Sequence, residues 1–232
     1  IIALPENFSL MSETKHQRHD AAERVNDVEA MLSAAARDNG VVIVGGSTPL
    51  PAPDGRVTNT CLVYDDHGRR IGRYDKIHLF DVSVSSSESY SESRHIAPGS
   101  EPLAVDALGL TLGITICYDL RFPELYRRLA AAGAELFTIP SAFTVPTGQA
   151  HWHTLLRARA IENLAWVVAP AQVGEHTSGR QTFGHSLIID PWGAIVAECA
   201  GGPGVIFAQL DRDNAAQRRQ QFPALAHRVL DR

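Results

Sequence analysis

The sequence predicts an α/β protein in which helices and buried strands alternate along one chain. Apolar residues at spacings of three and four indicate helices, and short β-branched runs that end at glycine or proline indicate buried strands. Two hairpin patterns add antiparallel strands. These observations allow either one mixed sheet or two sheets, and they do not say how the layers stack.

The first part of the chain contains one helix pattern and several strand patterns. A helix is predicted over residues 21–38 from its apolar spacing and the glycine after its end: Val25, Val28, Leu32, Ala35 and Gly40. Strands are expected at residues 1–4, as a buried strand that ends at Pro5, and at residues 41–44, with a hairpin from 60–64 and 69–74. The serine-rich residues 82–93 are expected to form a loop.

The second part continues the alternation of strands and helices. Strands are predicted at residues 111–116, 135–139, 165–169 and 205–210, with a hairpin from 186–190 and 194–198. One helix is expected from about residue 123 to 132, with proline in its first turn and Gly133 at its end. A second helix is expected over residues 151–163, and its apolar face comprises Leu155, Ala158, Ile161 and Leu164. The arginine-rich tail is expected to be helical.

Composition excludes several classes of protein. With 44% hydrophobic residues the chain is too apolar to be disordered, and no run approaches the roughly 18 apolar residues that cross a bilayer. The balance of 21 Lys and Arg against 26 Asp and Glu argues against a nucleic-acid partner. Three cysteines are too few for a disulfide framework and favour a reducing, cytoplasmic compartment.

The chain begins inside an apolar run, without methionine. We therefore expect a truncated N-terminus, and a targeting signal ahead of it stays open. No repeat or linker divides the 232 residues, so a single domain is predicted over residues 1–232.

Cys117 is the most informative residue for function. It ends a buried strand and is followed within six residues by a helix that begins with proline. Such a turn exposes a side chain at the carboxyl edge of the sheet, and its free backbone N–H groups lower the pKa of a thiol and bind an oxyanion. The competing interpretation is a small core residue. Cys61 and Cys199, which lack such a turn, are expected to be core residues.

Two charged residues also follow strands, Glu6 after residues 1–4 and Lys76 after residues 69–74. Charged side chains are rarely buried unless they are paired or functional. Each residue is therefore either a solvated strand end or a partner of Cys117, which needs a base to act as a nucleophile.

The histidines offer a rival interpretation, a metal site built from His151, His153, His176 and His185. However, His151 and His153 lie about 200° apart around a helix axis, so they do not easily share one ion. The sequence also lacks H-E-x-x-H, paired C-x-x-C, phosphate-loop and dinucleotide motifs. We therefore expect no metal and no cofactor.

Three segments resemble the nitrilase superfamily of carbon–nitrogen hydrolases and occur in the order of that family: Leu4-Pro5-Glu6-Asn7-Phe8, Tyr74-Asp75-Lys76-Ile77-His78-Leu79-Phe80-Asp81 and Ile116-Cys117-Tyr118-Asp119-Leu120-Arg121-Phe122-Pro123-Glu124-Leu125. The likeness continues to Gly184-His185-Ser186 and covers essentially the whole chain. The resemblance implies a four-layer α-β-β-α sandwich with two mixed β-sheets, usually dimerised through the helices that cover the sheets. It also implies that one strand and one helix normally precede residue 1.

The same resemblance assigns roles to four residues. It implies that Glu6 is the general base, Cys117 the nucleophile and Lys76, with the Tyr118 backbone N–H, the stabiliser of the oxyanion. An amide substrate then forms a thioester and releases ammonia, and water frees the carboxylic acid. A second glutamate assists in many members, and Glu92 is our choice over Glu88. In this sequence Ser85-Ser86-Ser87 stand where relatives usually carry proline or glycine.

Within the superfamily the chain is similar to the Nit branch. This likeness implies a small amide substrate that carries carboxylates, with deaminated glutathione favoured over 2-oxoglutaramate. Bidentate arginine suits a carboxylate, so Arg121 and Arg180 are candidate binding residues, beside Tyr118 and Phe143. An N-carbamoyl or nitrile hydrolase and a non-catalytic binding protein or scaffold are the alternatives. We expect a homodimer or larger homo-oligomer and no nucleic-acid or membrane partner.

Overall fold

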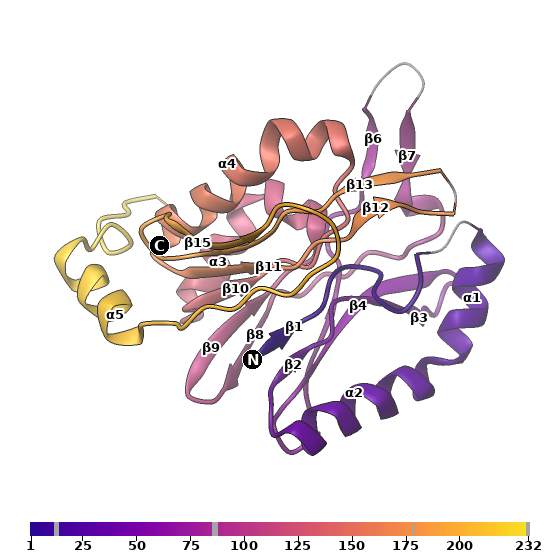
Figure 1. The fold of residues 1–232 in the computed structure, drawn as a ribbon, viewed down its shortest axis with the longest axis horizontal. Helices are drawn as coiled ribbons and strands as arrows, with labels where there is room; N and C mark the ends of the chain where they lie inside the picture. Colours follow the sequence, from indigo (N-terminus) through magenta and orange to yellow (C-terminus); the bar gives the residue numbers. More distant parts are fainter. Residues whose placement is uncertain (12–13, 85–87, 178, 231–232) are drawn as a thin grey trace.

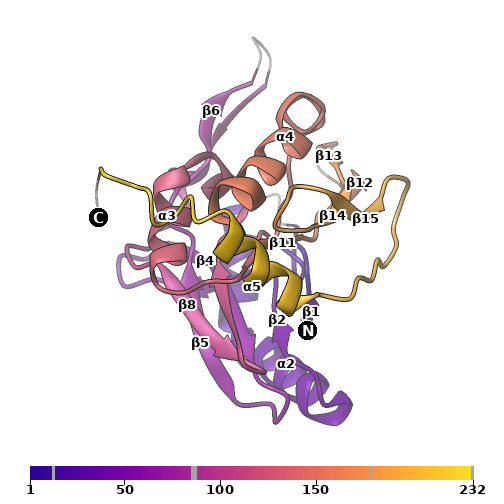
Figure 2. The same ribbon diagram turned by 90° about the vertical axis from the view of Figure 1, so that its left-hand side faces the viewer.

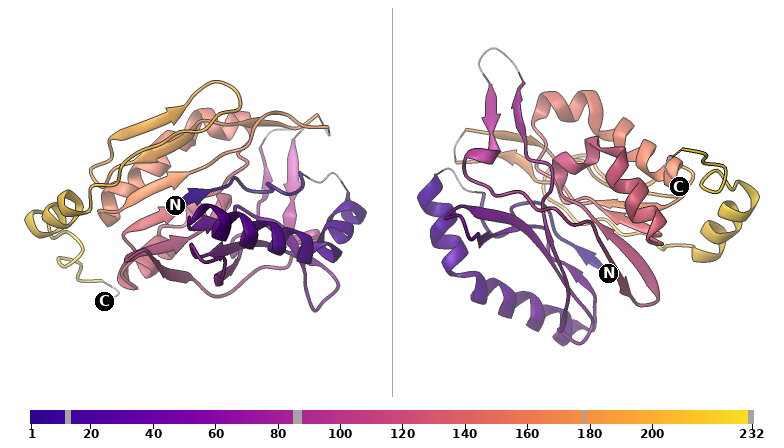
Figure 3. Two further views of the ribbon diagram at one scale, coloured as in Figure 1. Left: turned by 60° about the horizontal axis from the view of Figure 1, so that its bottom comes forward. Right: turned by 180° about the vertical axis from the view of Figure 1, so that it is seen from behind.

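The computed structural model describes residues 1–11, 14–84, 88–177 and 179–230. Two β-sheets face each other, with α1 (Lys15–Glu23) and α2 (Val25–Asn39) outside the first sheet and α3 (Pro123–Ala131) and α4 (Val145–Asn163) outside the second (Figures 1 and 3). This architecture is the four-layer α-β-β-α sandwich that the sequence resemblance implies.

The first sheet has the order β1 (Ile2–Ala3), β2 (Ile43–Val44), β4 (Val57–Tyr64) and β3 (Thr48–Pro51), and β5 (Arg70–Asp75) also pairs with β4. The β4–β5 hairpin confirms the prediction for residues 60–74. The expectation that residues 1–4 are buried is wrong, since Ile2 is 46% exposed. The reason is that, among the described strands, β1 lies at the edge of its sheet and pairs with β2 alone.

The second sheet has six strands: β15 (Ile195–Cys199), β14 (Ser186–Ile189), β11 (Trp166–Ala169), β10 (Leu136–Thr138), β9 (Leu110–Ile114) and β8 (Leu103–Ala107), in that order. The three central strands are parallel and the outer ones antiparallel, so the sheet is mixed. The predicted hairpin over residues 186–198 is confirmed. Strand β8 was not predicted from the sequence.

Strand β4 shows how the layers are joined. All eight of its residues are buried, and the side chains of its last four residues alternate between two clusters. Cys61 and Val63 belong to the cluster between the sheets, whereas Leu62 and Tyr64 pack with Leu32 of α2. Because side chains of a strand alternate between its faces, one strand contributes to both apolar layers.

Two helix predictions need correction. The pattern over residues 21–38 belongs to two helices that meet at Arg24, although Gly40 does form the expected left-handed C-cap with φ 61°. Helix α4 begins at Val145, and its buried side is displaced by one residue from the predicted face. Trp152, Leu156 and Ala160 are buried, while Ile161 is 46% exposed. The wrong face was chosen because Leu155 and Leu156 are adjacent, so apolar spacing alone fits either of two neighbouring faces.

The segment expected to be a loop, residues 82–93, contains regular structure. Strands β6 (Asp81–Ser83) and β7 (Ser89–Ser91) pair antiparallel, with Val82 opposite Tyr90, and the 3₁₀ turn Glu92–Arg94 follows. Ser85-Ser86-Ser87 lie outside the described residues. A second hairpin, β12 (Val173–Glu175) with β13 (Gln181–Phe183), lies near this one in Figure 1.

The C-terminal segment follows the outside of the second sheet and ends in α5 (Arg212–Gln221), which confirms the helical tail (Figure 2). The prediction of a strand at residues 205–210 is wrong. Its apolar residues do alternate, since Ile206 packs against the core and Phe207 is 84% exposed, but no described strand pairs with it. Within the described ranges, no helix has the length and apolar character to cross a membrane.

Candidate active site

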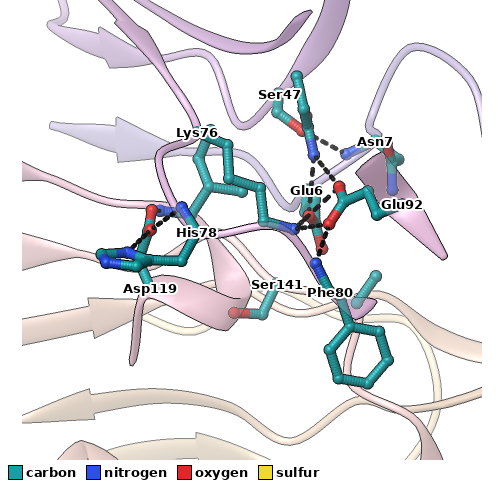
Figure 4. A network of polar contacts seen from close by, with 12 residues as sticks. Glu6, Asn7, Ser47, Lys76, His78, Phe80, Glu92, Asp119 and Ser141 are labelled. Carbon is teal, nitrogen blue, oxygen red and sulfur yellow. Dashed lines mark hydrogen bonds and ion pairs between the residues drawn. The ribbon is translucent and has the colours of Figure 1, made fainter. Parts of the chain in front are cut away.

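Cys117 lies where β9 ends and a 3₁₀ turn, Cys117–Arg121, begins. Its φ of 49° is left-handed, a conformation that side chains rarely adopt. Buried Asp119 braces this turn, accepting hydrogen bonds from the Ile116 N–H (2.9 Å), the Tyr74 hydroxyl (2.7 Å) and the backbone N–H of His78 (3.1 Å). Figure 4 shows the contact between Asp119 and His78. The turn thus holds the thiol at the carboxyl end of a parallel strand, as predicted.

Glu6 reaches the same place from the first sheet. Its segment crosses the end of β2 so closely that a side chain at Gly46 would collide with the Pro5 carbonyl. Gly46 has a left-handed φ of 53°, so glycine is required there on both counts. Gln172 donates to the Glu6 carbonyl at 3.0 Å, which fixes the segment from the other side.

Lys76 forms a buried ion-pair network with two glutamates. Its Nζ lies 2.9 Å from Glu6 Oε1 and 3.0 Å from Glu92 Oε2, and Lys76 and Glu6 are only 2% and 3% exposed (Figure 4). Glu92 also accepts the Phe80 N–H at 2.6 Å. Glu88 instead accepts a hydrogen bond from Tyr90, so Glu92 is the glutamate that reaches Lys76.

The ion pair determines the charges of its members. Burial by itself would raise the pKa of Glu6, but Lys76 and a hydrogen bond from Cys117 outweigh it, so the pKa is lowered. Burial would lower the pKa of Lys76, but Glu6 and Glu92 raise it well above its usual value. At neutral pH the site therefore contains a carboxylate and an ammonium group.

The Cys117 thiol behaves differently from the sequence-based expectation of a lowered pKa. Burial, followed by the negative charge of Glu6, raises its pKa, and the smaller effects of Lys76 and the Ala142 N–H do not compensate. The resting thiol is therefore protonated. Its reactivity must come from Glu6, which is hydrogen-bonded to it.

A cavity of about 470 Å³ opens onto these groups and is lined by all eight residues predicted for the site: Glu6, Lys76, Glu92, Cys117, Tyr118, Arg121, Phe143 and Arg180. The Arg121 guanidinium lies 5.4 Å from the centre of the Phe143 ring and 5.8 Å from that of Tyr118. Arg180 lies over the Tyr90 ring at 5.2 Å and donates to the Ala142 carbonyl.

Two residues of the cavity were missed from the sequence. Asn59 Nδ2 donates to Glu6 Oε1 at 3.0 Å, and its buried Oδ1 has no hydrogen-bond partner among the described residues. Arg18 of α1 also lines the cavity. Its pKa is lowered by burial, with Glu92 opposing and Arg180 adding to the effect, so two guanidinium groups share one region. Only the fold brings these distant residues together.

The remaining cysteines, and the histidines considered above as metal ligands, do not line the cavity. Cys61 is a core residue as predicted, and burial raises its pKa to about 12. The core assignment of Cys199 is wrong: it is only partly buried, at the end of an edge strand. His151 contacts Arg121 at 3.3 Å while His153 contacts Glu198, so these two histidines are separated as the helix geometry requires.

A protonated thiol, a carboxylate base and an ammonium group in one cavity can together carry out nucleophilic hydrolysis. Comparison with known proteins agrees with this chemistry. The sequence model of the carbon–nitrogen hydrolase family matches residues 1–220. The chain therefore belongs to the carbon–nitrogen hydrolase family, and it is a hydrolase of carbon–nitrogen bonds other than peptide bonds.

Individual relatives are similar over nearly the full chain. Deaminated glutathione amidase of Synechocystis sp. is 42% identical over 234 residues, which cover 99% of this chain and 86% of the relative. The crystal structure of the Caenorhabditis elegans NitFhit protein has a TM-score of 0.92 at 38% identity, over 98% of this chain and 56% of that one. An amidase of Nesterenkonia sp. AN1 is 28% identical, with a TM-score of 0.77 over 95% of this chain and 84% of its own, and carries acrylamide added at its active-site cysteine.

Proposed function

We propose that this chain is a cysteine-dependent amidase that hydrolyses deaminated glutathione, a small substrate with carboxylate groups, through a thioester intermediate. One observation carries the proposal: Cys117, Glu6 and Lys76 are buried together in a cavity whose wall also contains four arginines, Arg18, Arg94, Arg121 and Arg180. The name of the 42% identical relative supports the choice of substrate.

In the proposed first step, the Cys117 sulfur attacks the amide carbon as Glu6 takes the thiol proton. Because the resting thiol is protonated, attack and proton transfer belong to one step. Lys76 and the Tyr118 backbone N–H stabilise the developing oxyanion, and Glu92 holds Lys76 in place. Glu6 then donates the proton to the leaving amine, and the thioester remains.

In the second step, Glu6 removes a proton from water, which attacks the thioester and frees the acid and the thiol. The leaving group of the first step depends on the substrate. A primary amide releases ammonia, as expected above, whereas deaminated glutathione carries cysteinylglycine on the scissile nitrogen and releases that dipeptide. The expectation of ammonia release therefore applies only to primary amides.

Positive charge on the cavity wall supports an anionic substrate. Arg18, Arg121 and Arg180 all line the cavity, and Arg18 and Arg180 repel each other electrostatically. An anion placed between two guanidinium groups removes that repulsion and gains charge-assisted hydrogen bonds. A substrate with carboxylates at both ends fits this wall better than a neutral amide or a simple nitrile.

The test is a panel that contains deaminated glutathione, 2-oxoglutaramate, an N-carbamoyl amino acid and a simple nitrile. The first two both yield 2-oxoglutarate, so its release is measured together with the leaving amine. We expect the highest kcat/KM with deaminated glutathione. A higher kcat/KM with 2-oxoglutaramate would keep the chemistry and overturn the substrate, and no turnover on any compound would contradict the proposal.

Replacing Arg18 by glutamine is expected to raise KM for deaminated glutathione about tenfold and to change kcat by less than about twofold. The reason is that a charge on the cavity wall that does not touch the reacting atoms binds the ground state and the transition state alike. The matched control is Arg24→Gln, which removes an exposed arginine at the end of the same helix. A lowered kcat at unchanged KM would contradict this role and point to an effect through Glu92.

We also propose a homodimer or larger homo-oligomer in a reducing, cytoplasmic compartment. Exposed apolar side chains support association, among them Val205 at 78% and Phe207 at 84% exposed. The free cysteines support the compartment. Sedimentation velocity at micromolar concentration measures the association, and a monomer would contradict it.

A further inference from the structure

Three side chains of the kind that bind metals meet outside the active-site cavity. His153 comes from α4, His185 from the junction of β13 and β14, and Glu198 from β15. His153 Nε2 lies 2.9 Å and His185 Nδ1 lies 2.6 Å from the same oxygen, Glu198 Oε1. All three ligand atoms lie within 4.8 Å of one another.

The backbone and its neighbours hold His185 in this position. Its φ is 56°, a left-handed value that is uncommon for any residue except glycine. Its carbonyl accepts the Trp152 indole N–H at 2.8 Å, and its ring stacks on Phe183 with the ring centres 4.2 Å apart. The imidazole orientation is therefore set before any ligand binds.

The other two residues are placed by regular structure. Glu198 lies on β15 opposite Leu187 of β14, two residues from His185 along the chain. His153 follows buried Trp152 on α4. The side chains of His153, His185 and Glu198 are 35%, 25% and 29% exposed, so solvent and ions reach them.

We propose that His153, His185 and Glu198 bind one divalent transition-metal ion, and that zinc fits this donor set best. Two imidazoles and a carboxylate, with water in a fourth position, form a recurring zinc coordination sphere. Tetrahedral zinc with bonds of about 2.0–2.1 Å keeps its ligand atoms about 3.4 Å apart. The two nitrogen–oxygen distances of 2.9 and 2.6 Å therefore need to widen by about 0.5 and about 0.8 Å.

The arrangement of the contacts also suits a metal. One nitrogen of each histidine lies within hydrogen-bond distance of Glu198 Oε1, so the three ligand atoms already converge on one place. When the metal binds, its bonds to the three residues replace the hydrogen bonds from His153 Nε2 and His185 Nδ1 to Glu198. The proton of each imidazole is then on the other ring nitrogen, the one that does not bind the metal. None of the three residues lines the cavity around Cys117. The metal therefore connects edge strand β15 to α4 and is not part of the proposed hydrolysis.

The test is a zinc titration by calorimetry and a cobalt(II) titration followed by visible absorption, both on the full chain. Cys117→Ser is the starting protein, because a thiolate binds zinc and the active-site thiol would compete for the added metal. His153→Ala, His185→Ala and Glu198→Gln are then added singly, and His67→Ala, on an exposed turn, is the matched control. Melting temperatures without metal identify any variant that fails to fold.

We expect one zinc per chain, a tetrahedral cobalt spectrum, and affinity lowered at least about tenfold by each folded ligand variant but not by His67→Ala. If His185→Ala does not fold, His153→Ala and Glu198→Gln still decide the outcome. The proposal is overturned if no metal binds at micromolar concentration. It is also overturned if the three variants bind as tightly as the control.

Discussion

Replacing Cys117 by alanine is expected to lower kcat for the preferred amide by at least about 10⁴-fold. The covalent step then has no nucleophile, while the cavity and its charges remain. The measurement is release of 2-oxoglutarate from deaminated glutathione under saturating conditions. Cys61→Ala, which removes a buried thiol of the core, is the control and should keep its kcat within about threefold.

Retention of more than about 1% of kcat by Cys117→Ala would contradict the nucleophilic role.

The alkylation rate of Cys117 is an independent test of the same role. Because burial and Glu6 raise the pKa of Cys117, its thiol reacts only when Glu6 accepts the proton. We therefore expect Cys117 to react with iodoacetamide at neutral pH far faster than Cys61 or Cys199, and Glu6→Gln should slow that reaction.

Replacing Lys76 by methionine is expected to lower kcat by about 10³-fold and to reduce the free energy of unfolding by about 3–5 kcal/mol. The first effect comes from loss of a cation beside the oxyanion. The second arises because Glu6, only 3% exposed, loses its ion partner and then either stays charged in a buried place or takes up a proton, and both cost stability. Activity assays and urea unfolding at neutral pH measure the two effects.

The stability loss has a defined pH dependence. In the unaltered chain the lowered pKa of Glu6 contributes stability above its usual value of 4.5, and this contribution disappears as the pH falls through the folded-state pKa. The difference between Lys76→Met and the unaltered chain should therefore shrink below about pH 4.5.

A double variant, Lys76→Met with Glu6→Gln, separates the two effects of Lys76. It should recover much of the stability and none of the activity, because the fully buried carboxylate is gone and only the less buried Glu92 is left without its ion partner. A Lys76→Met chain as stable as the unaltered one would contradict the ion-pair argument. A Lys76→Arg chain serves as the control that keeps the charge and changes the geometry.

The sequence predicted those parts of the fold that depend on local patterns. The hairpin of β4 and β5, the proline-started helix α3 and the cap at Gly40 follow from turn chemistry and spacing that act within a few residues. The predicted strand at 205–210 failed because a strand also needs a neighbour to pair with, and no local pattern supplies that. Burial of residues 1–4 failed for a similar reason, since their position at the sheet edge depends on distant strands.

In the candidate site, too, local patterns revealed some residues and only the folded structure revealed the others. The residue types and strand ends at Glu6, Lys76 and Cys117 were visible in the sequence, and the resemblance connected them. Asn59 and Arg18 carry no motif and are brought to the cavity only by the packing of β4 and α1. The direction of the pKa shift of Cys117 also depended on burial, which the sequence did not reveal.

The proposed nucleophile and its proposed base come from opposite sides of the interface between the sheets. Glu6 and Lys76 follow strands of the first sheet, and Cys117 follows a strand of the second. A chain whose sheets have slipped apart keeps its carboxylate–ammonium pair but loses the thiol from reach. Turnover is thus a sensitive reporter of how closely the two sheets are docked, and it should disappear at milder denaturant concentrations than the helical circular dichroism signal.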